Sequence, residues 1–143
     1  MHDDARRLEN LLDREIEAAR LLSIALVAEK AALTGDDTDA VHTMAAEKIR
    51  LLGTLETMEV ERRALWPVPA GTLSFGNAVA ERWRSLMQLM AGCRAANEVN
   101  GHIIHIRQNQ IRQLLDIVRG GPPLTYGPQG KTFAKALRAL ARA

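Results

Sequence analysis

A single apolar seam that runs from Val79 to Val118 constrains this chain of 143 residues more than any other feature. Its positions alternate between spacings of four and three residues, which is the heptad pattern of helices that pack side by side. A helix of about 42 residues forms a rod of about 63 Å at 1.5 Å per residue. The seam consists of Val79, Trp83, Leu86, Met90, Cys93, Asn97, Asn100, Ile104, Arg107, Ile111, Leu114 and Val118. We therefore predict that this helix packs in a coiled-coil-like bundle.

Two shorter helices are predicted before the seam, over residues 3–33 and 39–65. In both, apolar residues recur at spacings of three and four. One flank of the second helix is marked by Val41, Ala45, Lys48, Leu52, Leu55 and Arg62. The stretch "TGDDTD" between the helices has a glycine to end the first and Asp or Thr to cap the second.

Proline and glycine clusters divide the rest of the chain. "WPVPAGTLSFGN" separates the second helix from a third over 77–118, and "RGGPP" stops the third. The predicted fold is all-α. We expect an elongated antiparallel three-helix coiled-coil-like bundle over 1–119, followed by a loop and a short C-terminal amphipathic helix within 120–143.

Composition excludes several classes of protein. Aromatic residues make up only 3% of the chain, fewer than β-rich domains usually carry. The single cysteine rules out a disulfide within the chain. The first residues, "MHDDARRLEN", do not resemble a signal peptide, and the longest apolar run, "LLSIALVA", is too short to cross a bilayer. We expect a soluble, intracellular protein without membrane insertion.

Charge is distributed unevenly along the chain. Residues 1–61 hold 14 acidic and 7 basic side chains, whereas residues 62–143 hold 3 acidic and 12 basic ones. The basic part could bind nucleic acid or an anionic surface. Alternatively, the two parts pack together and partly neutralise each other. We favour the second interpretation, because the basic residues are spread along a helix and aromatic groups for base stacking are few.

Three residues interrupt the apolar pattern of the third helix. Asn97 and Asn100 fall on the seam, and Gly101 follows them. A polar layer in a seam lowers stability but penalises wrong registers and wrong oligomers. Glycine would let a neighbouring backbone approach closely, at a cost of about 1 kcal/mol relative to alanine. We interpret the three as a structural polar layer that fixes register; direct contact with a partner is the alternative.

No arrangement of residues points to catalysis, a cofactor or a metal. Glu98, His102 and His105 share one helix flank, but a metal site needs a further cluster of ligands, and the sequence has none at matching spacing. Cys93 lies on the seam and is interpreted as a small buried apolar residue. We therefore predict a protein that is not an enzyme, with no cofactor and no metal.

The last 24 residues have a different character. A Pro/Gly-rich loop carries two isolated apolar residues, Leu124 and Tyr126. In the helix that follows, Phe133, Leu137 and Leu140 share one face, and basic residues occupy the opposite one. A helix of about eleven residues is not stable alone in water, so its apolar face must pack against something. It either folds back on its own bundle or binds a partner.

Several segments, in their order and spacing, resemble the FlgN family of flagellar export chaperones. They are "EKIRLLGTLETMEVERR" from Glu47 to Arg63, "AERW" from Ala80 to Trp83, "NEVNG" from Asn97 to Gly101, "RQNQ" from Arg107 to Gln110 and "YGPQGKT" from Tyr126 to Thr132. The resemblance covers about residues 40–132.

The resemblance implies a cytoplasmic chaperone without enzymatic activity. Such a chaperone binds hook-associated proteins of the hook–filament junction, prevents their premature assembly and delivers them to the flagellar export gate. It also implies that the C-terminal segment binds the client and that Tyr126 contacts the gate. The partner-binding residues that we predict in this segment are Leu124, Tyr126, Phe133, Leu137 and Leu140. A homodimer remains open. The alternative is a helical protein whose basic part binds nucleic acid or an anionic surface.

Overall fold

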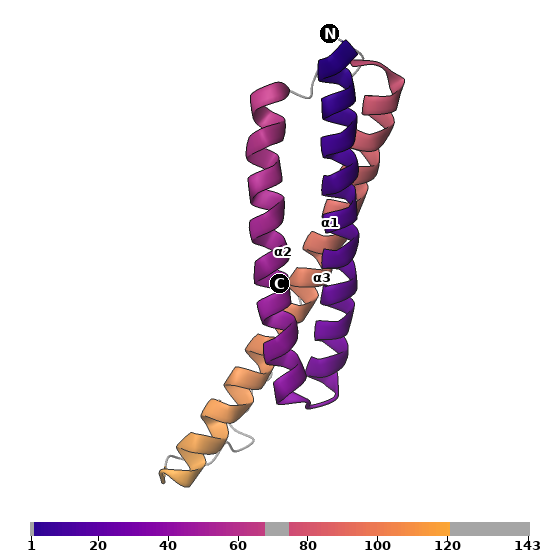
Figure 1. Ribbon diagram of the computed structural model, residues 1–143. Coiled ribbons are helices and arrows are strands. Elements are labelled where there is room, and N and C mark those ends of the chain that lie inside the picture. The colour runs from indigo at the N-terminus through magenta and orange to yellow at the C-terminus, as the bar shows by residue number, and fades with distance from the viewer. Residues whose placement is uncertain (1, 68–74, 121–143) are drawn as a thin grey trace. The chain divides into compact units, whose positions relative to one another are not determined.

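A computed structural model describes residues 2–67 and 75–120 of the chain. Three helices account for most of these residues: α1 (His2–Thr34), α2 (Thr38–Leu65) and α3 (Asn77–Val118) (Figure 1). No strand occurs within the two described ranges. The prediction of an all-α protein is therefore confirmed, and the predicted helix ends differ from the observed ones by at most one residue.

The chain separates into two compact units, Met1–Ala96 and Asn97–Ala143. The first unit holds α1, α2 and the first half of α3. The described part of the second unit is the remainder of α3 and the two residues that follow it. The division predicted after residue 119 depends on residues outside the described ranges and stays a prediction.

The turn between α1 and α2 is short because local hydrogen bonds end one helix and begin the next. The amide of Gly35 donates to the carbonyl of Ala31 at 2.9 Å. Asp36 then adopts a left-handed conformation with φ of 56°, which aspartate tolerates better than most residues. The side chain of Asp37 caps α2 by accepting from the amide of Ala40 at 3.1 Å. The tight reversal makes α1 and α2 antiparallel neighbours (Figure 1).

One apolar cluster lies where α2 ends and α3 begins. It is built from Leu8, Leu12, Ile16 and Ala19 of α1, Trp66 after α2, and Val79 and Leu86 of α3. The ring of Trp66 meets those of Phe75 and Trp83 edge to face, with centroid distances of 6.2 and 5.3 Å. Edge-to-face pairs add to the stabilisation from burial alone. These three aromatic residues therefore join the end of α2 to the start of α3.

A second cluster lies further along α1, towards the α1–α2 turn. All three helices contribute to it, through Leu22, Ala25 and Leu26 of α1, Leu51 of α2 and Cys93 of α3. The thiol of Cys93 lies 3.6 Å from the carbonyl oxygen of Ala19 and is buried. Burial raises the pKa of this thiol above its ordinary value, which keeps it protonated and unreactive. Cys93 is thus a packing residue, as its place on the seam predicts.

Two ion pairs between α1 and α2 lie among the apolar side chains, and the one at Arg62 is buried while the one at Lys48 is partly buried. Nε of Arg62 donates to both carboxylate oxygens of Glu15, at 3.1 and 3.0 Å. Nζ of Lys48 lies 3.0 Å from a carboxylate oxygen of Glu29. Glu15 and Glu29 are 2% and 1% exposed, so removing the partner of either carboxylate would be costly. The two pairs explain why the apolar flank of α2 contains Lys48 and Arg62.

The surroundings of Glu15 work against its ionisation. Burial raises its pKa above the ordinary value, and the charge and hydrogen bonds of Arg62 only partly oppose that rise. The guanidinium of Arg62 also lies 4.7 Å from the ring centroid of Trp83, and the face of that ring attracts the cation. Arg62 thus links the acidic side chain on α1 to the aromatic cluster.

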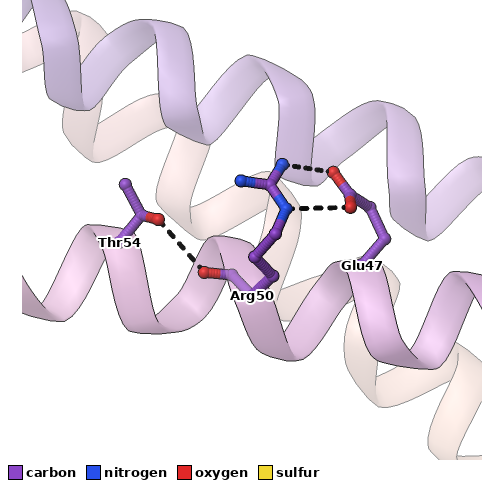
Figure 2. Close-up of polar contacts among 3 residues, drawn as sticks. All are labelled: Glu47, Arg50 and Thr54. Carbon is purple, nitrogen blue, oxygen red and sulfur yellow. Dashed lines mark hydrogen bonds and ion pairs between the residues drawn. The ribbon is translucent and has the colours of Figure 1, made fainter.

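An exposed ion pair on α2 contrasts with the buried ones. Figure 2 shows Arg50 donating two hydrogen bonds to the carboxylate of Glu47 and Thr54 donating to the backbone carbonyl of Arg50. The hydrogen bonds from Arg50 hold the pKa of Glu47 below its ordinary value. Exposed pairs of this kind contribute little to stability, because water already solvates both charges.

The first prediction concerns the buried pair. We expect Arg62→Leu to lower the free energy of unfolding by about 3–5 kcal/mol at neutral pH, since it leaves the carboxylate of Glu15 buried without a counter-charge. Without Arg62 the folded-state pKa of Glu15 rises further, so the folded protein holds this proton more tightly than the unfolded chain. The variant therefore loses stability as pH rises through this raised pKa. Near pH 4 its free energy of unfolding differs less from that of the unaltered protein. Urea unfolding, followed by circular dichroism at neutral pH and near pH 4, measures the free energy of unfolding.

Arg50→Leu is the matched control, because it makes the same change in an exposed pair on the same helix. It should unfold at nearly the same urea concentration as the unaltered protein at both pH values. Equal losses in the two variants would contradict the importance given to the buried pair.

Candidate partner-binding surface

The seam of α3 is covered in the first unit. Val79, Leu86 and Cys93 are at most 3% exposed, and each belongs to one of the two apolar clusters. An ion pair adds to this packing, since Nε of Arg82 donates to a carboxylate oxygen of Asp13 on α1 at 2.8 Å. The first half of α3 therefore packs as its heptad pattern predicts.

The same seam is exposed near the end of α3. Ile111, Leu114 and Val118 are 57%, 62% and 82% exposed. Leu115 and Ile117 lie beside them and are exposed too. We call these five residues the terminal face of α3. Contiguous exposed apolar residues on a protein surface usually mark a place where another molecule binds.

The terminal face has a basic flank and ends abruptly. Arg112 and Arg119 are exposed and lie one heptad apart on the same side of the helix, with the exposed Asp116 between them. The amide of Arg119 donates to the carbonyl of Leu115, and Gly120 adopts a left-handed conformation with φ of 83°. This is a common way for a helix to end before a proline. The terminal face therefore directly precedes, in the sequence, the segment for which partner binding is predicted.

The predicted partner-binding residues themselves lie outside the described ranges. They are Leu124, Tyr126, Phe133, Leu137 and Leu140. Their role stays a prediction. Two apolar residues of the terminal face, Leu115 and Ile117, are absent from the predicted seam and were missed. The dense run "IRQLLDIV" was the available signal, since it makes the apolar face wider than a seam.

The predicted polar layer is not uniform. Asn97 is exposed, Asn100 is 1% exposed and Gly101 is half-buried. No described atom lies within 4 Å of the position that a Cβ would occupy at Gly101. The close backbone approach expected at this glycine is therefore not found among the described residues. Whether the layer fixes register stays a prediction.

The described ionisable side chains do not form a metal site. In residues 2–67 and 75–120, no three His, Cys, Asp or Glu side chains gather closely enough to hold a metal ion, and this includes Glu98, His102 and His105. Within the same part of the chain, none of the helices is both long and apolar enough to cross a bilayer.

The second prediction follows from the open space at Gly101. We expect Gly101→Ala to raise the free energy of unfolding by about 1 kcal/mol, because alanine favours the helix and meets no neighbour. Thermal unfolding measures the change. Gly92→Ala is the matched control on the same helix, since a Cβ there also meets nothing within 4 Å. A loss of stability for Gly101→Ala alone would show that another backbone approaches Gly101 after all.

Comparison with protein families identifies the chain. The model of the family described as "FlgN protein" matches residues 1–133. Comparison with curated proteins and with solved structures gave no match. The family match covers nearly the whole chain, including all three helices. The chain therefore belongs to the FlgN family, a family of flagellar export chaperones whose partners are hook-associated proteins.

Proposed function

We propose that this protein is a cytoplasmic chaperone that holds terminal helices of hook-associated proteins and delivers them to the flagellar export gate. The observation that carries the proposal is the terminal face of α3, which exposes five aliphatic side chains in its last two turns. The family match supports the general role, and the resemblance to FlgN chaperones supports the choice of client.

The terminal face suits a client that must be released. Burying a half-exposed aliphatic side chain contributes about 1 to 2 kcal/mol, so five give a gross gain of roughly 5 to 10 kcal/mol. Against this gain, association costs at least about 4 kcal/mol in lost translational and rotational freedom. A surface of this size therefore binds an amphipathic helix without holding it permanently.

The segment after α3 extends this surface in the proposal. Phe133, Leu137 and Leu140 would supply a second apolar stripe, on a helix too short to be stable alone. Its folding would then accompany client binding, which weakens binding and eases release. Tyr126 in the loop is proposed as the contact with the export gate, because an aromatic side chain buries a large area at low entropic cost.

The basic flank supports a second candidate. Arg112 and Arg119 could place the same helix on nucleic acid or on an anionic surface. Such binding weakens steeply as salt rises, whereas binding through apolar groups does not. The terminal face could also join two copies of the chain. Titration of the protein with nucleic acid or anionic vesicles at two salt concentrations tests binding through the basic flank. The mass of the free protein in solution tests whether two copies join.

The third prediction tests the client site. A chain truncated after Gly121 should remain folded, since both apolar clusters lie before residue 97. It should bind a purified hook-associated protein at least tenfold more weakly in calorimetry, because it has lost the proposed apolar stripe of Phe133, Leu137 and Leu140. Circular dichroism verifies that it is folded. Full client affinity in the truncated chain would place the client site elsewhere.

The fourth prediction separates the gate contact from the client contact. Tyr126→Ala should leave folding and client affinity unchanged but weaken retention of the export gate protein in a pull-down at least tenfold, since it removes the proposed aromatic anchor. Thr125→Ala is the matched control in the same loop and should retain the export gate protein as the unaltered chain does. If Tyr126→Ala unfolds the protein, Tyr126 is a core residue and the proposed gate contact is wrong.

A further inference from the structure

A groove runs between α2 and the first half of α3, entirely within the first unit. Its volume is about 510 Å³. Leu55 of α2 and Leu86 and Met90 of α3 provide its apolar surface, and the Glu15–Arg62 ion pair lies at one end. Helix α1 packs against both α2 and α3, so the groove occupies the place where a fourth helix would complete a bundle.

Each wall of the groove presents one stripe of side chains. On α2 the stripe is Leu52, Leu55, Glu56 and Glu59, and on α3 it is Leu86, Met87, Met90 and Arg94. These spacings of three and four place each set along one side of its helix. Leu52 and Met87 are 44% and 40% exposed, one on each wall. Methionine adapts its shape to a bound apolar group more readily than branched residues do.

The length of the walls limits what can bind. The α2 wall runs from Leu52 to Arg62 and the α3 wall from Leu86 to Arg94. At 1.5 Å per residue these spans are about 15 and 12 Å. An amphipathic helix of about three turns, with apolar residues at spacings of three and four, fills such a groove.

The charges along the two walls differ in sign. Glu56 is exposed on the α2 wall and Arg94 is exposed on the α3 wall, and neither makes an ion pair with another described residue. Glu59 is already paired with Arg63 at 2.8 Å, and Glu15 with Arg62. The groove therefore favours a helix that has a basic flank towards α2 and an acidic flank towards α3.

We infer that this groove is a second docking site for the client, and that it holds one amphipathic helix of about three turns with flanks of opposite charge. The inference rests on the proposed function, because the helix is taken to come from the hook-associated protein. It adds a site that is separate from the terminal face of α3. A client would then be held at two places on the chain.

The experiment uses the full-length chain and a purified hook-associated protein in calorimetry. The groove variant is Leu52→Asp with Met87→Asp, which places a charge on each apolar wall. The matched control is Ile24→Asp with Val27→Asp, two aliphatic residues of α1 that are 65% and 66% exposed and do not line the groove. We expect the groove variant to bind at least tenfold more weakly and the control to bind as the unaltered chain does.

A second variant tests the charges without changing the net charge. Glu56→Lys combined with Arg94→Glu exchanges the signs of the two walls, and both side chains are exposed, so folding is preserved. We expect at least a fivefold loss of client affinity at low salt that shrinks as salt is raised. Circular dichroism of every variant verifies that it is folded.

The possible results separate the two proposals. If the unaltered chain does not bind the hook-associated protein, the proposed function fails and the inference fails with it. If it binds, and both groove variants bind equally well, the groove is not a client site while the proposed function stands. If the groove variants instead lower the mass of the free protein in solution, with client affinity unchanged, a second copy occupies the groove and the inference is wrong.

Discussion

Packing against α1 is the constraint on which the described structure depends. Helix α1 buries thirteen side chains, whereas α2 buries only Leu51 and Arg62. Both apolar clusters are centred on α1, and the ion pairs to Arg62, Lys48 and Arg82 all start from acidic residues of α1. A core organised around one helix leaves α2 and α3 with apolar side chains that face solvent.

Exposed apolar surface of this kind is a cost for an isolated protein and an advantage for a chaperone. Leu52 and Met87 line the groove in the first unit, and the terminal face of α3 lies in the second. A client rich in amphipathic helices can cover such surfaces, and the chaperone needs no chemical step to do so. Membership of the FlgN family is consistent with a proposed role of these surfaces in binding a client.

Periodicity predicted the helices well, because it records which side of each helix is apolar. It placed the ends of α3 at residues 77 and 118, as observed. It could not predict that the seam is covered at Leu86 and exposed at Leu114, because the same pattern arises whether a neighbouring helix or a partner covers it. The sequence pattern placed Lys48 and Arg62 on one flank of the second helix, but their partners on α1 could not be predicted without the pairing of α1 with α2. The groove could not be predicted either, because it depends on the distance between α2 and α3.

We propose that the terminal face of α3 binds the client. Amide hydrogen exchange of the full-length protein, with and without a hook-associated protein, tests it most directly. We expect the amides from Ile104 to Val118 to exchange at least tenfold more slowly in the complex, while the amides of α1, whose apolar side chains are already buried, change little. Unchanged exchange over that stretch in a complex that has demonstrably formed would contradict the account.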